Sequence, residues 1–268
     1  MSSSDAMTRL TILGTGSCCP PPGGEVACFL LNDDVLIDTG WNVAAHMRRF
    51  GRDPLAVRTV FITHCHHDHY MGLVGLLFNC AMAEGGRRKA DPPTIVGPRT
   101  EIRNAVDRAL HFLQNERYDL VAPPDVVPLS PSRPYETGRF RVRTAQTIHP
   151  TLALAYRFED KRTGAVAAFS GDTAPHAPLS GLAAGADVLC HEASLGAREG
   201  DPLADWGHAG ALDAARVAAS AGCKRLCLVH HSDPIDDATL ARAREIFPET
   251  TVPQEGDVLD LPIDARER

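Results

Sequence analysis

The 268-residue sequence has no run of apolar residues long enough to cross a membrane, and its longest apolar runs have the length of a strand. The first ten residues, MSSSDAMTRL, also lack the basic and apolar segments of a secretory signal peptide. We therefore expect a cytoplasmic protein that does not bind a membrane. Since no polar segment is long enough to be a linker, we expect residues 1–7 to be a disordered lead and residues 8–268 to form one domain.

Paired cysteine motifs and an excess of positive charge are absent as well. The chain has eight cysteines but no CxxC pair, and most of them lie in apolar runs typical of strands or helices. Free thiols in a reducing compartment are therefore predicted rather than disulfides. The formal net charge of −7 gives no electrostatic reason to expect a polyanion as the main partner.

The chain consists of two β-rich halves that are each followed by helices. Strand patterns include TRLTILGTG and RTVFIT in the first half and AVAAFSGDT and RLCLVHHS in the second. Helical spacing is found in GLVGLLFNCAMA, in EIRNAVDRALHFL and in the alanine-rich residues 209–221. This order favours two sheets packed face to face with helices outside them.

The segment THCHHDHYMG, residues 63–72, contains four histidines and one aspartate within six consecutive positions. It follows the strand RTVFIT, so His64 and His66 point to the same side of an extended chain. Asp68 and His69 lie where the chain turns into the next helix, and they approach the same point from another angle. The pattern offers two ligand pairs to two adjacent cations. Imidazole and carboxylate ligands suit zinc, iron, manganese or nickel, and a metal site is favoured over an exposed histidine cluster.

Further ligands are expected at the ends of other strands. His149 follows RTAQTI, Asp172 follows AVAAFSG, and His230 or His231 ends RLCLV. Taken alone, Asp172 has a helix N-cap as its alternative, and His149 has a capping or core role. Together with the first motif, the interpretation as ligands is favoured for both. Asp172 has two oxygens with which to bridge two cations.

The motifs that follow one another along residues 8 to about 232 resemble those of the metallo-β-lactamase superfamily, and within it those of the tRNase Z branch. They are LTILGTGS, DVLIDTGW, VFITHCHHDHYMGLVGLL, TIVGP, SGDT, ADVLCHEAS and LCLVHHS. The resemblance implies an α+β fold, an αββα sandwich of two mixed β-sheets flanked by helices. It also implies a homodimer and two divalent metal ions, which we expect to be Zn²⁺, with Mn²⁺ or Fe²⁺ as alternatives.

The same resemblance implies roles for individual residues. One ion would be held by His64, His66 and His149, the other by Asp68, His69 and His230, with Asp172 bridging them. In the tRNase Z branch an H-E-A-T element and a later H-S-T element form a proton relay, and residues 191–194 and 208–210 correspond to them here. His208 would then protonate the leaving group, Glu192 would orient His208, and Asp68 would also aim the nucleophile. The alternative for His208 is to cap the helix that starts at Ala209.

Two adjacent cations lower the pKa of a shared water, so this site would supply a hydroxide for hydrolysis. We expect the substrate to be a small phosphodiester or a related sulfate ester. A lactonase or thioesterase would use the same site on a carbon ester. A tRNA 3′-processing endonuclease and a non-catalytic metal-binding protein are weaker alternatives.

Several departures from the tRNase Z pattern argue against a nucleic-acid partner. Many tRNase Z enzymes hold tRNA with a long arm between the third histidine and the bridging aspartate, whereas His149 and Asp172 are only 23 positions apart here. The hydroxyl of H-S-T is also missing at residue 209. With the acidic net charge, these departures favour a small-molecule substrate. Arg87, Arg88 and Lys89 are expected to form a solvated loop, with attraction of an anionic substrate as the alternative.

Overall fold

The computed structural model describes residues 7–82, 91–201 and 205–262, and within these ranges the strands form two seven-stranded sheets. The first sheet has the order β14-β1-β2-β3-β4-β5-β6 and the second has the order β13-β12-β11-β10-β9-β8-β7. The strands of the first sheet are β1 (Thr8–Gly14), β2 (Cys28–Leu31), β3 (Val35–Ile37), β4 (Thr59–Phe61), β5 (Thr94–Pro98), β6 (Val126–Leu129) and β14 (Val258–Leu261). Those of the second are β7 (Tyr135–Glu136), β8 (Phe140–Gln146), β9 (Leu154–Asp160), β10 (Val166–Phe169), β11 (Val188–Glu192), β12 (Leu226–Val229) and β13 (Thr250–Thr251).

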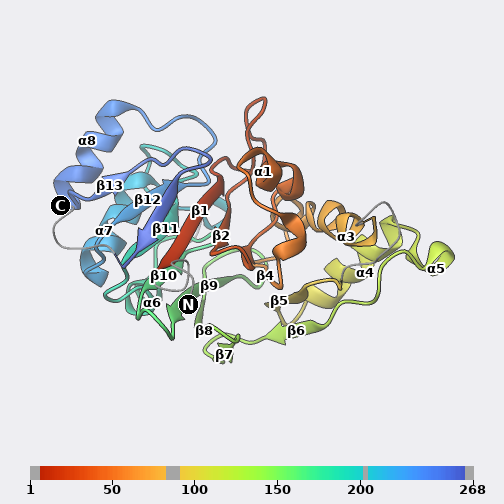
Figure 1. Cartoon of the computed structure of the whole chain (residues 1–268). Helices are drawn as coiled ribbons and strands as arrows, with labels where there is room; N and C mark the ends of the chain where they lie inside the picture. Colours follow the sequence, from red (N-terminus) through yellow and green to blue (C-terminus); the bar gives the residue numbers. More distant parts are fainter. Residues whose placement is uncertain (1–6, 83–90, 202–204, 263–268) are drawn as a thin grey trace.

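Helices cover the outer faces of the two sheets (Figure 1). The α-helices in the described ranges are α1 (Val43–Arg49), α2 (His67–Tyr70), α3 (Leu73–Ala81), α4 (Ile102–Phe112), α5 (Asn115–Tyr118), α6 (Ala177–Leu182), α7 (Ala211–Ala221) and α8 (Asp237–Ile246). Two 3₁₀ turns, η2 (Pro54–Ala56) and η4 (Asp205–Gly207), are also present there. Buried side chains of α1, α3 and α4 pack on the first sheet, and those of α6 and α7 pack on the second.

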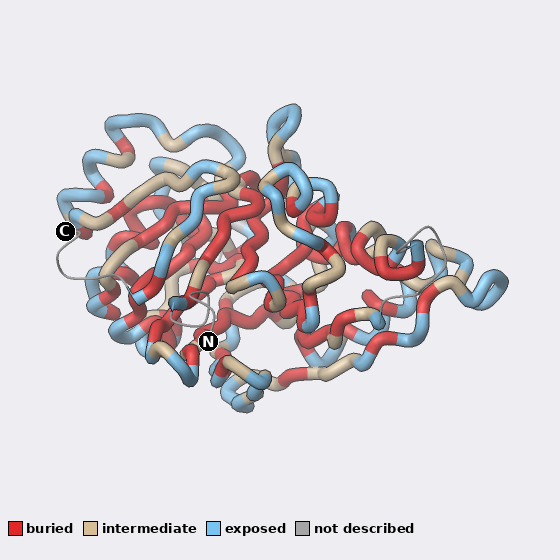
Figure 2. Tube along the Cα trace, in the orientation of Figure 1, coloured by how far each residue is buried: buried red, intermediate tan, exposed pale blue. Residues whose placement is uncertain are grey.

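The main core lies between the sheets. Phe29 and Phe61 of the first sheet meet Phe158 and Phe169 of the second, with ring centroids 4.9 Å apart in both the Phe29–Phe169 and Phe61–Phe158 pairs. Figure 2 shows the buried strands in the centre and exposed residues on the outer helices and loops. Both sheets contain parallel and antiparallel pairs. The predicted αββα sandwich of two mixed sheets is therefore confirmed.

Parallel pairing brings the functional strand ends together. The strands β10, β11 and β12 are parallel neighbours, so their carboxyl ends lie at the same edge of the second sheet. Asp172 follows β10, Glu192 ends β11, and His230 follows β12 directly. The histidine-rich segment follows β4 of the first sheet and reaches the same edge. One edge of the sandwich thus collects polar side chains from both sheets.

Some expectations fall outside the described residues or remain predictions. Residues 1–6 of the expected lead lie outside the described ranges, as do Arg87, Arg88 and Lys89, while β1 begins at Thr8. The division into a lead and one domain stays a prediction. Among the described residues, no helix combines the length and the apolar character needed to span a membrane.

Candidate metal centre

The seven residues expected to bind metal come together at this edge. Their ligand atoms form three overlapping groups in which all atoms lie within 4.8 Å of one another. The groups are His64, His66 and His149, then His64, His69 and Asp172, and then Asp68, His69 and His230. Local structure explains how the histidine-rich segment supplies several of these residues. His66 is the extended N-cap of α2, while Asp68 and His69 belong to that short helix. Side chains from a strand end and from a helix therefore converge on one point.

The donor atoms of this cluster are suited to holding cations. His64 Nε2, His69 Nε2, His230 Nε2 and Asp172 Oδ1 are buried and have no hydrogen-bond partner. His149 Nε2 also faces His66 Nδ1 at 3.0 Å. Buried polar atoms without partners are costly, and neutral imidazoles and carboxylates are ordinary ligands of divalent transition metals. The residues present therefore fit a metal centre.

Electrostatics favour the ligand forms of His64 and Asp172. Burial, assisted by His69, holds the pKa of His64 well below its usual value, so this ring stays neutral, as a metal ligand must. Burial raises the pKa of Asp172, but the imidazoles of His230 and His69 outweigh burial and hold that pKa well below its usual value. Asp172 is therefore an ionised, buried carboxylate in the middle of the cluster.

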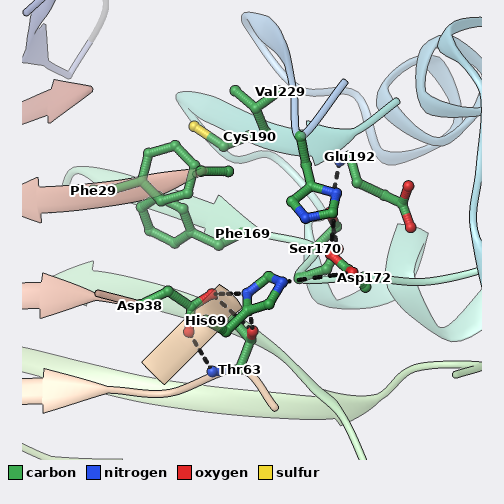
Figure 3. A pocket seen from close by; sticks show the side chains of 13 residues that line it. Phe29, Asp38, Thr63, His69, Phe169, Ser170, Asp172, Cys190, Glu192 and Val229 are labelled. Atoms are coloured by element: carbon green, nitrogen blue, oxygen red, sulfur yellow. Dashed lines mark hydrogen bonds and ion pairs between the residues drawn. The ribbon is translucent and has the colours of Figure 1, made fainter. Parts of the chain in front are cut away.

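Asp38 fixes the orientation of His69, and the sequence analysis did not identify it. Its Oδ2 lies 2.9 Å from His69 Nδ1, and its carboxylate accepts hydrogen bonds from the backbone amide and hydroxyl of Thr63. Figure 3 shows Asp38, Thr63 and His69 joined in this network. A ligand histidine held through its second nitrogen is the usual arrangement in metal sites. The available signal was an aspartate directly after the apolar strand VLI, which is the same kind of signal that pointed to Asp172.

The choice between His230 and His231 is decided by the chain geometry. His230 has a left-handed backbone, with φ of 54°, and its ring enters the cluster. Ser194 Oγ lies 2.9 Å from His230 Nδ1, so the far nitrogen, Nε2, lies toward Asp68 at 3.5 Å. His231 belongs to none of the described ligand groups, and its backbone forms an isolated β-bridge with Gly16 instead. Ser194 is thus a second supporting residue that the sequence analysis did not assign.

The other residues of the motif face elsewhere. His67 is exposed and lies beside the ring of Tyr70, with ring centroids 5.9 Å apart. Cys65 packs against the outer core under α3 and α4, where burial raises the pKa of its thiol to about 12. A protonated, inward-facing thiol is not a ligand at neutral pH.

His208 and Glu192 form a hydrogen-bonded pair beside the metal ligands. His208 Nδ1 lies 2.9 Å from Glu192 Oε1, and Glu192 is buried and also accepts from the backbone amide of Thr173. Burial lowers the pKa of His208, but the hydrogen bond to Glu192 and its charge outweigh burial and raise it to about 9. Helix α7 begins at Ala211 with Gly210 as its N-cap, so His208 does not cap it. The alternative role for His208 is therefore wrong.

A cavity of about 450 Å³ opens onto the cluster. His66, Asp68, His149, His208 and His230 line it on the side of the ligands. Arg198 and Trp206 line it nearer the surface, since both side chains are exposed. The arrangement places a positively charged group and an aromatic ring around the mouth of a polar site.

Comparisons with known proteins agree with this fold. Residues 33–231 match the family described as "Beta-lactamase superfamily domain". The ribonuclease Z of Methanothermobacter thermautotrophicus is 29% identical, over 92% of this chain and 94% of its own length. The ribonuclease BN of Erwinia tasmaniensis is 27% identical, over 90% of this chain and 96% of its own length.

Solved structures with the same fold cover nearly the whole chain. The metallo-beta-lactamase fold protein YhfI from Bacillus subtilis superposes with a TM-score of 0.79 at 23% identity, over 95% of this chain and 99% of its own. The short form of human tRNase Z superposes with a TM-score of 0.74 at 24% identity, over 95% of this chain and 100% of its own.

These relatives overturn one expectation. The net charge and the short segment between His149 and Asp172 were interpreted as evidence for a small-molecule partner and against nucleic acid, yet the relatives are named ribonuclease Z. That prediction was wrong. A net charge of −7 averages the whole surface and does not describe the potential in one cavity. A projecting segment can also lie elsewhere, and Figure 1 shows α4 and α5 extending from one end of the molecule.

Proposed function

The chain belongs to the beta-lactamase superfamily, and from this premise we propose that it is a metal-dependent phosphodiesterase that cleaves RNA. It is a hydrolase of that superfamily, similar to the tRNase Z branch, as the motifs predicted. The observation that carries the proposal is the cluster of five imidazoles and two carboxylates at the floor of an open cavity. The choice of RNA is supported by relatives named ribonuclease Z and ribonuclease BN that align along almost their whole length.

We assign the ligands to two divalent ions. His64, His66 and His149 would hold one ion, Asp68, His69 and His230 the other, and Asp172 would bridge. Zn²⁺ suits these nitrogen and oxygen donors best, with Mn²⁺ or Fe²⁺ as alternatives. When bound, such ions stabilise charge on a phosphoryl group and lower the pKa of water.

The protein's own side chains supply orientation and proton transfer. Glu192 accepts a hydrogen bond from His208 Nδ1, so Nε2 of His208 is the nitrogen available to exchange a proton with the leaving oxygen. Thr173 donates its backbone N–H to Glu192 and fixes that carboxylate in place. Asp68 lines the cavity, where its carboxylate would aim the nucleophile.

A cleavage assay tests the proposal. The metal-loaded protein would be incubated with a precursor tRNA carrying a 3′ trailer, with an unstructured RNA of equal length, and with acyl thioester and lactone substrates. We expect endonucleolytic cleavage of RNA that a chelator abolishes and added Zn²⁺ restores. Hydrolysis of the thioester or the lactone without cleavage of either RNA would assign the site to carbon esters and overturn the proposal.

A further inference from the structure

We propose that Trp206 is the stacking platform of a nucleotide subsite, in which it binds the nucleobase beside the scissile phosphodiester while Arg198 faces the phosphate. This inference rests on the proposed function, because it names the part of an RNA substrate that the cavity mouth recognises. It concerns residues that lie outside the metal ligands and the His208–Glu192 pair.

The exposure of Trp206 points to a ligand. Its side chain lines the cavity, yet the residue is 80% exposed, whereas the chain's other tryptophan, Trp41, is 45% exposed. An indole contributes to stability mainly through the apolar area that it buries, and Trp206 buries little. Packing therefore does not account for an indole at this position, whereas contact with a flat apolar ligand does.

The backbone places Trp206 next to a residue that contacts a proposed metal ligand. Trp206 has φ of 56° and ψ of 21°, a left-handed backbone conformation that residues other than glycine rarely adopt. The next residue, Gly207, has φ of 74°, and a Cβ there would lie 2.5 Å from the carbonyl oxygen of Ile148. His149 Nδ1 in turn donates a hydrogen bond to the carbonyl oxygen of Gly207 at 3.1 Å. The backbone that carries the indole is thus hydrogen-bonded, through Gly207, to the ring of His149.

The cavity has the size and chemistry for one nucleotide. Its volume of about 450 Å³ lies within the range of pockets that bind small ligands. The phosphate would lie over the ligand cluster, and the guanidinium of Arg198 is a planar donor that suits phosphate oxygens. Bases of any sequence can stack on an aromatic ring, so this subsite would select a nucleic acid without selecting a particular base.

Tryptophan fluorescence tests the inference without turnover. Trp41→Phe leaves Trp206 as the only tryptophan, because the chain has two. This variant, with its metal, would be titrated with adenosine 5′-monophosphate and with ribose 5-phosphate, which lacks the base. We expect saturable quenching by the nucleotide and none by the sugar phosphate. The reciprocal Trp206→Phe variant, which reports only on Trp41, should show no quenching.

Affinity provides the second measurement. Trp206→Ala should weaken binding of adenosine 5′-monophosphate about 5- to 100-fold, leave ribose 5-phosphate unaffected, and be rescued largely by Trp206→Phe. Equal nucleotide affinity in the wild type and Trp206→Ala would overturn the inference, even if RNA is cleaved. Base-dependent quenching without RNA cleavage would instead support this subsite and overturn the proposed function.

Discussion

His66 and His67 are neighbours in the chain but have opposite surroundings. His66 is half-buried, and its Nδ1 faces His149 Nε2 at 3.0 Å, whereas His67 is exposed. The difference arises because His66 is the extended N-cap of α2 and His67 is already helical. The change of backbone conformation between them turns consecutive side chains in different directions.

We predict that His66→Ala loses bound metal and that His67→Ala does not. The wild type should contain about two equivalents of divalent metal, and removing one of the three histidines that would hold one ion should release at least that ion. The measurement is metal content by mass spectrometry after gel filtration. Equal metal losses from the two variants would contradict the ligand assignment.

His208→Ala should reveal its role through the leaving group. General acid catalysis contributes about 10²- to 10⁴-fold when the leaving oxygen needs a proton, as a ribose alkoxide does. We expect a loss of that order in kcat for RNA and a much smaller loss for bis-p-nitrophenyl phosphate, since nitrophenolate leaves without a proton. His111→Ala, at an exposed histidine far along α4, is the matched control. A uniform loss across leaving groups would indicate a structural role for His208.

At the scale of elements, the turn between α2 and α3 determines where Asp68 and His69 of α2 lie. The backbone amide of Gly72 donates to Gly40 O at 2.7 Å, and that of Thr39 donates to His69 O at 2.9 Å. A Cβ on Gly72 would overlap the carbonyl oxygen of Thr39. The loop after β3 and the start of α3 therefore approach closely only because residue 72 is glycine.

Two glycines of the same segment should respond in opposite ways to alanine. Gly72→Ala should lower the free energy of unfolding by roughly 1–3 kcal/mol, because the backbone must shift to admit the methyl group. Gly75→Ala should raise it by about 0.5–1 kcal/mol, because Gly75 lies inside α3 and a Cβ there has no atom within 4 Å. Urea unfolding monitored by circular dichroism measures both. A similar change in both variants would contradict the close contact at Gly72.

At the scale of the whole molecule, Asp160 joins the two sheets. It ends β9 of the second sheet and accepts a hydrogen bond from Thr8 Oγ1 of β1, in the first sheet, at 2.6 Å. It also accepts from Arg139 Nε at 2.6 Å and from the backbone amide of Arg162 at 2.8 Å. Burial raises the pKa of Asp160, but these hydrogen bonds outweigh burial and hold the pKa below its usual value of 3.8.

This low pKa predicts how stability depends on pH. A carboxylate whose pKa is lower in the folded protein stabilises it above the unfolded pKa, near pH 4, and this contribution is lost as the pH falls through the folded value. Asp160→Asn should therefore lower the free energy of unfolding by roughly 1.5–3 kcal/mol at pH 7 and by less at pH 3. Urea unfolding of metal-free protein at both pH values tests this.

The control for Asp160 is an exposed carboxylate. Asp33 has a side chain that is 61% exposed and pairs with Arg52 at 3.2 Å on the surface. Asp33→Asn should change stability by about 0–1 kcal/mol at pH 7, because exposed ion pairs contribute little. If Asp160→Asn and Asp33→Asn behave alike, Asp160 does not join the sheets as proposed.

The expected homodimer and cytoplasmic location stay predictions at this scale.

The sequence by itself was sufficient to predict the sandwich and the residues that converge at its edge. Each proposed ligand is a polar residue at the end of an apolar strand or in the first turn of a helix, and such patterns are local. The carboxyl ends of strands that run in the same direction meet at one edge, so His149, Asp172 and one of the pair His230 and His231 were predictable as candidates from their own neighbours in the chain. Overall charge was a poor guide to the substrate because it carries no information on position.

Only the tertiary structure decided how these side chains are held. Asp38 contacts His69 across 31 positions of the chain, and Gly207 contacts His149 across 58. No spacing pattern encodes such pairs, because their contact depends on how segments that follow different strands of one sheet pack against one another. The same packing selected His230 over His231, left Cys65 in the outer core, and placed Trp206 at the mouth of the cavity. Local chemistry thus predicted the candidate donors, and long-range packing determined which atoms of each candidate face the site.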